Sequence, residues 1–145
     1  MRLDAGMDVI AEVSAVLRRH VEDTNRMWAT GEIASDSAIR DVEPGLSAVQ
    51  WSPKYETGVW RVESGSEWID DTADAGRQLA GQGCRWELTD LVVLPRGDHE
   101  AAASYRVVHH WGDPARPPAQ ALFLETWRRG EDGRWRLARH AAEKA

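Results

Sequence analysis

The sequence of 145 residues has one cysteine, Cys84, and lacks any long apolar run. A single thiol cannot form an internal disulfide or a metal site made of several cysteines, and no cluster of histidines precedes it, so we expect no structural zinc. The N-terminus has no basic segment followed by an apolar one. Neither a signal peptide nor a membrane span is therefore expected, and the sequence favours a cytoplasmic protein that uses no metal or other cofactor.

Positive charge is also scarce, since 18 Lys and Arg residues stand against 24 Asp and Glu residues and the formal net charge is −6. Such an acidic chain is a poor partner for nucleic acid or for an anionic membrane surface. Lysine occurs only at positions 54 and 144, and Asn25 is the single asparagine. This bias suggests a bacterial source with a high GC content.

Tryptophan is abundant, whereas the other aromatic residues are rare: the chain has 8 Trp, 2 Tyr and 1 Phe. An indole has a broad apolar face and one N–H donor, so several of them can fill a core or line a cavity for a flat ligand. A chain of this length has the usual size of one domain and buries about 70% of its unfolded surface. Residues 1–145 are therefore predicted to form a single domain.

Hydrophobic spacing predicts helices first and strands second, which is an α+β pattern. Apolar residues recur at helical spacing before the helix end at Gly31, and Ser66 can cap a later helix. The expected elements are helices over 9–28, 33–40 and 67–80, brief extended pieces at 48–51 and 58–63, and strands over 85–94, 100–111, 119–129 and 134–141.

Alternation of side chains along the first two long strands places a single acid on an apolar face. This face is expected to carry Cys84, Trp86, Leu88, Asp90, Val92 and Leu94. A loop at 95–98 would pair Leu88 with Tyr105 and Asp90 with Ala103. Asp90 could act there as a general acid or base whose pKa is raised by desolvation. The alternatives are a local bulge that turns Asp90 to solvent and a hydrogen bond to the backbone.

The closing hairpin brings a carboxylate and an imidazole together. Asp132-Gly133 is a strong signal for a two-residue turn, which would pair Glu125 with His140, and a longer even loop would make them diagonal neighbours. Either arrangement allows a proton-transfer dyad in which the carboxylate fixes the imidazole tautomer. The alternative is an ordinary cross-strand contact worth roughly 0.2–1 kcal/mol. The opposite face is predicted to be plain core and carries Leu122, Leu124, Trp135 and Leu137.

Other familiar signatures are missing. The sequence has no glycine-rich phosphate loop, no nucleophile elbow and no HExxH zinc motif. His109 and His110 point to opposite faces of a strand, so they cannot chelate one ion. The arginines of the closing hairpin alternate with tryptophans, but in an acidic chain they fit a solvated hairpin or a dimer interface better than a nucleic-acid site.

Three segments resemble the NTF2-like superfamily, and within it the SnoaL-like and DUF4440-type small proteins. They are residues 25–32, residues 65–69 and, as the best match, the closing hairpin over 126–140. The resemblance covers nearly the whole chain in the order of its elements. It departs from the common pattern at 43–63, where a longer helical stretch would lead into a strand.

This resemblance implies a cone-shaped α+β fold, in which N-terminal helices pack on a bent antiparallel sheet around a pocket, and often a homodimer formed through the sheet. Members of the superfamily include ketosteroid isomerase, polyketide cyclases, scytalone dehydratase and limonene epoxide hydrolase, and also many pocket proteins without an established activity. Their chemistry needs no metal. No position-by-position match to the catalytic set of these enzymes is found.

Two functions follow as hypotheses. The first is a cofactor-independent isomerase, cyclase or dehydratase that acts on a hydrophobic, polyketide-like or aromatic small molecule by acid/base chemistry. The second is a non-catalytic ligand-binding protein or a dimeric accessory module. For the first, the candidate catalytic residues are Asp90, His140 and Glu125, and the candidate substrate-binding residues are Trp28, Trp86, Tyr105 and His109.

Overall fold

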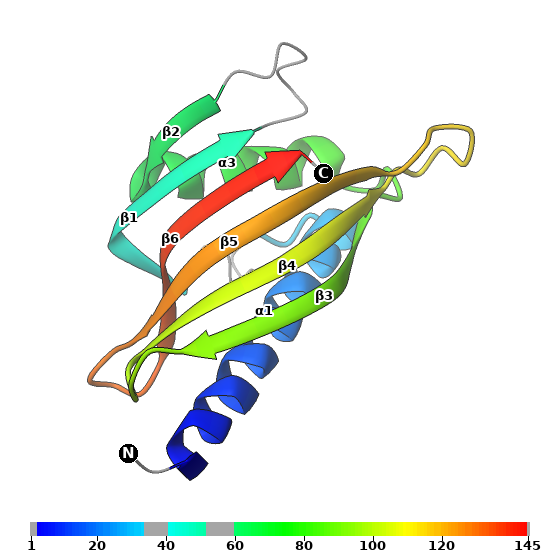
Figure 1. Cartoon of the computed structure of the whole chain (residues 1–145). Coiled ribbons are helices and arrows are strands. Elements are labelled where there is room, and N and C mark those ends of the chain that lie inside the picture. The colour runs from blue at the N-terminus through cyan, green and yellow to red at the C-terminus, as the bar shows by residue number, and fades with distance from the viewer. Residues whose placement is uncertain (1–2, 34–40, 52–59, 145) are drawn as a thin grey trace.

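The computed structural model describes residues 3–33, 41–51 and 60–144, and Figure 1 shows their arrangement. The elements are α1 (Leu3–Thr30), β1 (Val42–Trp51), β2 (Trp60–Ser64), α3 (Gly65–Leu79), β3 (Arg85–Pro95), β4 (Glu100–His110), β5 (Ala119–Arg129) and β6 (Trp135–Lys144). This order matches the prediction. Of the short helix expected over 33–40, residues 34–40 lie outside the described residues.

The strands form one six-stranded sheet in the order β2-β1-β6-β5-β4-β3. β1 runs parallel to β6 and the other neighbours are antiparallel, so the sheet is mixed, whereas an antiparallel one was expected. α1 packs against β3 and β4, and α3 packs against β1 and β2. Both helices cover the same face of the curved sheet (Figure 1). The predicted α+β cone fold is confirmed; we call the helix-covered face the inner face and the opposite one the outer face.

The core lies between α1 and the inner face of the sheet. The helical stripe of α1 buries Val13 and Leu17 completely, and the sheet contributes Trp127 and Leu137, which are also 0% exposed. α1 ends as predicted at Gly31, which has a positive φ of 77°. The amide of this glycine donates to the carbonyl oxygen of Met27 at 2.7 Å.

A β-bulge in β3 interrupts the predicted register. The pairing with β4 shifts between Thr89 and Val92, and Asp90 lies in this bulge with a φ of 56°. Val93 pairs with Ala103 in place of Asp90. The prediction that Asp90 lies in an apolar row opposite Ala103 is therefore wrong, because the bulge turns its side chain to solvent.

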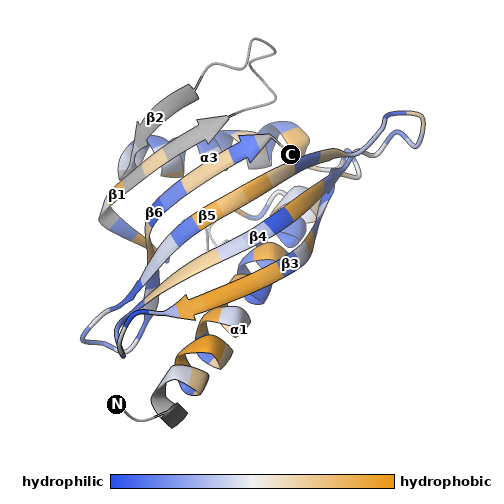
Figure 2. Ribbon diagram, in the orientation of Figure 1, coloured by the Kyte–Doolittle hydropathy of each residue, from blue (hydrophilic) through white to orange (hydrophobic). Residues whose placement is uncertain are grey.

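The same bulge exchanges the two faces of β3. Val92 and Leu94, predicted to share the apolar face with Trp86, are 63% and 59% exposed, whereas Val93 is buried. β3 is apolar to its end, as the hydropathy colours show (Figure 2), and after the bulge Val93 faces inward while Val92 and Leu94 face outward. The outer face of the sheet is left with exposed aliphatic side chains.

A second register shift, in β6, decides the geometry of the closing hairpin. The loop is not the predicted two-residue turn, because the amide of Gly130 donates to the carbonyl oxygen of Arg134 at 2.9 Å. Trp127 therefore pairs with Leu137 and not, as predicted, with Ala138. The register then shifts by one residue at Ala138, which restores the predicted pairing of Glu125 with His140.

The predicted division of this hairpin into faces is partly wrong for the same reason. Trp135 and Leu137 are buried on the inner face at 5% and 0% exposure, whereas Leu124 is 52% exposed on the outer face. The extra residue in β6 reverses the alternation after Leu137. His140 consequently shares the inner face with Trp127, and Leu124 does not belong to the core.

A buried aspartate joins the entry of β1 to two other elements. Asp41 is 2% exposed, and its Oδ2 accepts a hydrogen bond from Arg19 of α1 at 3.0 Å. Its Oδ1 accepts from Arg134 of the closing hairpin. The amide of Leu137 also donates to the carbonyl oxygen of Asp41, at 2.8 Å. These contacts hold β1 beside β6, against which it runs in parallel.

α3 begins with a capping box. The side chain of Ser64 accepts a hydrogen bond from the amide of Glu67, while the Glu67 carboxylate accepts from the amide of Ser64. The sequence pointed to Ser66 as the cap, which is two residues too late. The hydroxyl of Ser66 lies 3.2 Å from that of Ser64 and does not cap the helix.

We predict that Ser64→Ala lowers the free energy of unfolding by about 1 kcal/mol, because the first turn of α3 loses its acceptor. Ser66→Ala is the matched control, and its effect should stay within about 0.5 kcal/mol. Urea denaturation monitored by circular dichroism measures both. Equal losses in the two variants would contradict the assignment of Ser64 as the cap.

Candidate functional site

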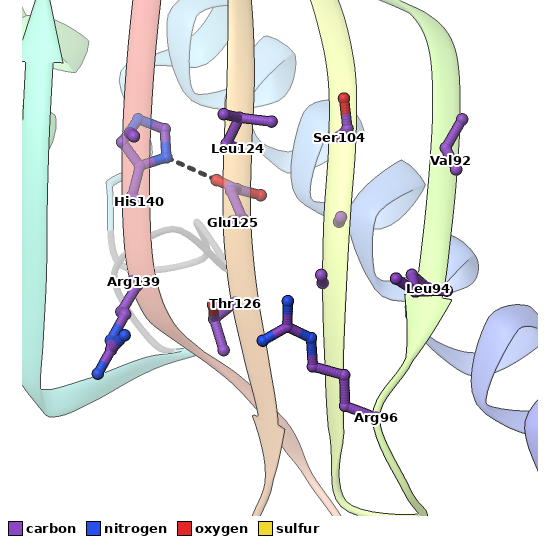
Figure 3. A pocket seen from close by; sticks show the side chains of 12 residues that line it. Val92, Leu94, Arg96, Ser104, Leu124, Glu125, Thr126, Arg139 and His140 are labelled. Atoms are coloured by element: carbon purple, nitrogen blue, oxygen red, sulfur yellow. Dashed lines mark hydrogen bonds and ion pairs between the residues drawn. The ribbon is translucent and has the colours of Figure 1, made fainter.

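The inner face of β5 and β6 carries a buried carboxylate–imidazole pair. Glu125 and His140 are directly opposite each other, as the sequence predicted. The distance from Nδ1 of His140 to Oε2 of Glu125 is 2.6 Å, and the two side chains are 1% and 2% exposed. The hydrogen bond is drawn as a dashed line in Figure 3. Water is excluded from this contact, so its electrostatic effect is much larger than that of a surface pair.

Two further donors complete the environment of Glu125. Its Oε1 accepts from the hydroxyl of Tyr105 at 2.7 Å and from Nε1 of Trp127 at 3.1 Å. Burial by itself would raise the pKa of Glu125, but the hydrogen bond and charge of His140, the charge of His20 and the Tyr105 hydroxyl together lower it below its ordinary value. Glu125 is therefore a carboxylate.

Tyr105 was predicted to contact a substrate, and the structure places its hydroxyl on Glu125. Burial, followed by the charge of Glu125 and the hydrogen bond to it, raises the pKa of Tyr105 well above its ordinary value. The phenol thus stays protonated and acts as a donor. Its contribution to the site is to hold the Glu125 carboxylate in place.

The carboxylate of Glu125 fixes the tautomer of His140. Because a carboxylate only accepts, Nδ1 of the imidazole carries a hydrogen, and Nε2 is the ring nitrogen left to face a ligand. Nε2 is buried and has no hydrogen-bond partner within the described part of the chain. The ring lies 4.5 Å from that of Trp68 and 4.8 Å from that of Phe123, measured between centroids. Nε2 of His140 thus lies among aromatic rings.

His20 of α1 belongs to the same cluster and is not among the residues predicted from the sequence. Its ring packs edge-on against Trp127 with the centroids 6.1 Å apart, and the residue is 4% exposed. It occupies the stripe of α1 that also buries Leu17 and Thr24. A histidine at a stripe position is the signal that could have identified it. Trp68 and Phe123, which enclose His140, were also missed, although Phe123 shares the face of Glu125 by alternation.

Asp90 does not belong to this site. Its side chain is 75% exposed and lies 3.6 Å from the guanidinium of Arg106. The alternative interpretation of the sequence is therefore correct: a bulge in β3 turns Asp90 to solvent. The structure therefore separates Asp90 from Glu125 and His140, with which it was predicted to act.

The three other predicted ligand-binding residues form a second cluster on the inner face. The ring centroid of Trp28 lies 5.1 Å from that of Trp86 and 5.1 Å from that of His109. Nε1 of Trp86 donates to Nδ1 of His109 at 3.0 Å. Phe123 lies 5.7 Å from Trp86 and 4.8 Å from His140, so it connects the two clusters. One continuous aromatic row therefore leads from Trp28 to His140.

His109 is a neutral imidazole. Burial in the first place, and then the charges of Arg116 and His110, lower its pKa from 6.5 to about 4. Since the Trp86 indole donates to Nδ1, the hydrogen of this neutral ring is on Nε2. His109 therefore offers an N–H donor on the side away from Trp86.

The outer face of the sheet carries a shallow pocket of about 580 Å³. Its floor consists of Ala102 and Ser104 of β4, whose small side chains lie between the larger residues of β3 and β5. Figure 3 shows this pocket with its labelled side chains. Its lining residues are Val92, Leu94, Arg96, Ala102, Ala103, Ser104, Leu124, Glu125, Thr126, Arg139, His140 and Ala141. Glu125 and His140 are among them although their side chains belong to the inner face, so the pocket lies across the sheet from the buried pair.

Within residues 3–33, 41–51 and 60–144, no group of three or more His, Cys, Asp or Glu side chains could hold a metal ion. His110 contacts Glu87 at 3.4 Å and is not joined with His109 in a chelating pair. Cys84 is buried beside Met27 and Trp28. No helix of the described residues is long and apolar enough to cross a membrane.

No family model and no curated protein sequence matches this chain. Solved structures do match it. An NTF2-like protein of unknown function from Pseudomonas putida KT2440 has a TM-score of 0.75 and 14% identity, with 94% of this chain and 87% of that chain covered. The sequence resemblance to NTF2-like proteins is therefore confirmed at the level of the fold. The narrower DUF4440-type assignment has no support in these matches.

Two further matches carry more specific names. A candidate ketosteroid isomerase from Parabacteroides distasonis has a TM-score of 0.58 and 13% identity, over 86% of this chain and 84% of that one. LinA has a TM-score of 0.64 and 13% identity, over 95% of this chain and 90% of that one. Identities this low establish a shared fold and leave activity to be argued from the site.

We predict that His109 makes the protein less stable in mild acid. Between pH 6.5 and about 4 the unfolded chain binds a proton at this imidazole that the folded chain does not, so the free energy of unfolding falls as pH falls through this range. Urea denaturation across the range measures the slope. His109→Gln should flatten it, and His99→Gln, at an exposed position in the β3–β4 turn, is the control. An unchanged slope in His109→Gln would refute the prediction.

Proposed function

We propose that this protein is an enzyme of the isomerase, cyclase or dehydratase type that moves a proton on a hydrophobic small molecule without a metal. The main support is the buried imidazole of His140. Its Nδ1 is hydrogen-bonded to Glu125 at 2.6 Å, and its Nε2 has no hydrogen-bond partner in the described ranges. An imidazole oriented by a carboxylate is a competent general base near neutral pH. The aromatic rings around it favour an aromatic or polyketide-like substrate.

The roles of the residues follow from their contacts. Nε2 of His140 removes a proton from a carbon next to a substrate carbonyl, and the electron pair moves onto the carbonyl oxygen as an enolate. Glu125 stabilises the imidazolium that results, while Tyr105 and Trp127 keep the carboxylate in position. In a β,γ-unsaturated substrate the enolate is conjugated with the double bond, and the imidazolium returns the proton to the γ carbon as the carbonyl re-forms, which completes an isomerisation. In a β-hydroxy substrate the enolate electron pair re-forms the carbonyl and breaks the C–O bond, and the hydroxyl group takes the proton and leaves as water.

The low dielectric of the site supports this proposal. A carboxylate buried among Tyr105, Trp127 and His140 interacts with a developing imidazolium much more strongly than it would in water. The match to a candidate ketosteroid isomerase is consistent with an isomerase on this fold. At 13% identity, neither this match nor the one to LinA assigns an activity to the chain. The aromatic or polyketide-like nature of the substrate is likewise proposed.

We predict that His140→Gln lowers kcat about 10²–10⁴-fold, because the general base is lost. Glu125→Gln should have a loss of similar size, because an amide can donate to Nδ1 and favours the wrong tautomer. The assay is the exchange of the acidic C–H protons of naphthyl methyl ketone in D₂O, followed by NMR, together with the conversion of a β,γ-unsaturated ketosteroid to its conjugated isomer.

Asp90→Asn is the matched control, since it also removes one carboxylate but at the exposed bulge of β3. Its turnover should equal that of the wild type. Circular dichroism and thermal melting establish that the His140 and Glu125 variants fold. If folded His140→Gln exchanges the ketone protons as fast as the wild type, His140 is not the base.

A homodimer through the outer face of the sheet is the second part of the proposal. Val92, Leu94 and Leu124 are 63%, 59% and 52% exposed, and they surround a floor of small residues that a second sheet could cover. If turnover is absent while ligand binding remains, the same surface favours the alternative function of a dimeric ligand-binding or accessory module.

We predict that Leu124→Arg converts the dimer into a monomer, because a charge would be buried in the contact. Size-exclusion chromatography with light scattering gives the mass. Ile10→Arg, at an exposed apolar position of α1, is the control and should leave the dimer intact. A wild-type protein that elutes with the mass of one chain at high concentration would disprove the interface.

A further inference from the structure

Two N–H donors in the Trp28 cluster are buried without an acceptor. Nε1 of Trp28 and Nε2 of His109 have no hydrogen-bond partner among the residues that the structure describes. Both carry a hydrogen: an indole nitrogen always does, and Nε2 of His109 does because its Nδ1 accepts from Trp86 at 3.0 Å. Buried donors that make no hydrogen bond cost free energy, so a pair of them requires an explanation.

The two donors are neighbours in an apolar, aromatic environment. The rings of Trp28 and His109 are in edge contact, with 5.1 Å between their centroids. Trp111 lies 4.1 Å from His109, and Trp28 is 5% exposed. Flat rings on several sides with a few unpaired polar hydrogens among them are the usual composition of a small-molecule site.

The charge around the cluster favours an electron-rich partner. The guanidinium carbon of Arg116 lies 3.4 Å above the ring of Trp111, which places a positive charge beside His109. The same charge, added to burial, keeps the His109 ring neutral by lowering its pKa to about 4. The ring therefore presents one fixed N–H donor over the physiological pH range.

We propose that Trp28 and His109 together bind the oxygen acceptor of a flat apolar ligand, such as the carbonyl of an aromatic or polycyclic ketone. Trp86 is a positioning residue, because its indole N–H selects the tautomer of His109 that donates. An oxygen bound here would accept from Nε1 of Trp28 and from Nε2 of His109, two donors for which no described residue provides an acceptor.

The proposal rests on the proposed function in one respect, namely that the ligand of this cluster is the substrate of His140. The aromatic row Trp28, Trp86, Phe123 and His140 connects the two sites, with centroid separations of 5.1, 5.7 and 4.8 Å. A polycyclic molecule along this row would place one oxygen at the donors and, at its other end, the C–H group next to its reacting carbonyl at the base. The substrate class is thus a polycyclic ketone with a second oxygen acceptor far from the reacting carbon.

The test compares two probes of the same shape. Naphthyl methyl ketone has a carbonyl oxygen where isopropenylnaphthalene has a methylene group, so only the ketone can accept a hydrogen bond. Isothermal titration calorimetry should find that the wild-type protein binds the ketone about tenfold more tightly. Trp28→Phe and His109→Phe should each reduce this preference several-fold. Trp135→Phe is the matched control, because its N–H already donates to Glu12 at 2.9 Å and should not affect the preference.

A spectroscopic readout separates hydrogen bonding from packing. In a ¹⁵N-labelled protein the indole cross-peak that disappears in Trp28→Phe belongs to Trp28. Saturation with the ketone should move this peak downfield, and saturation with the hydrocarbon should not. Equal affinity for the two probes, no detectable binding of the ketone, or a preference that survives both Phe substitutions would overturn the subsite.

The same probes in His140→Gln distinguish this proposal from the proposed function. If the wild-type protein prefers the ketone but does not exchange its protons, the subsite stands and the catalytic role of His140 is rejected. Proton exchange that depends on His140 without any ketone preference does the reverse.

Discussion

The architecture of the inner face depends on the buried carboxylate of Glu125. A carboxylate removed from water is tolerated only if donors replace its hydration, and here Tyr105, Trp127 and His140 do so at 2.7, 3.1 and 2.6 Å. These donors come from β4, β5 and β6, so one charge fixes the side chains of three neighbouring strands. His20 of α1 packs edge-on against Trp127, with 6.1 Å between the centroids, so α1 also contacts this cluster.

Two bulges decide which side chains of β3 and β6 face the inside of the sheet. The one at Ala138 changes the alternation of β6, so that Trp135 and Leu137 fill the core and His140 still faces Glu125. The one at Asp90 turns an acid out of the core and brings Val93 into it. Each bulge costs regular pairing locally, and each places a polar side chain where its charge can be accommodated.

The abundant tryptophans have different roles in the structure. Trp127 and Trp135 use their N–H groups to satisfy carboxylates, Glu125 and Glu12 respectively. Trp86 uses its N–H to set the tautomer of His109. In the described part of the chain Trp28 is the buried indole whose N–H lacks an acceptor, which makes it the one that points to a ligand. Residue counts alone could not have separated these roles.

The sequence by itself determined the order of the elements and the inward face of β4, because both depend on local periodicity, which short stretches of sequence contain. The predicted pairing of Glu125 with His140 is also observed, but it depends on the bulge at Ala138, which offsets the one-residue difference between the actual loop and the predicted two-residue turn. The tertiary structure alone decided the two bulges, and with them the outward position of Asp90 and the true core face of β6. A bulge inserts one residue where packing and buried charge across several strands demand it, and that balance is not encoded in the alternation of any single strand.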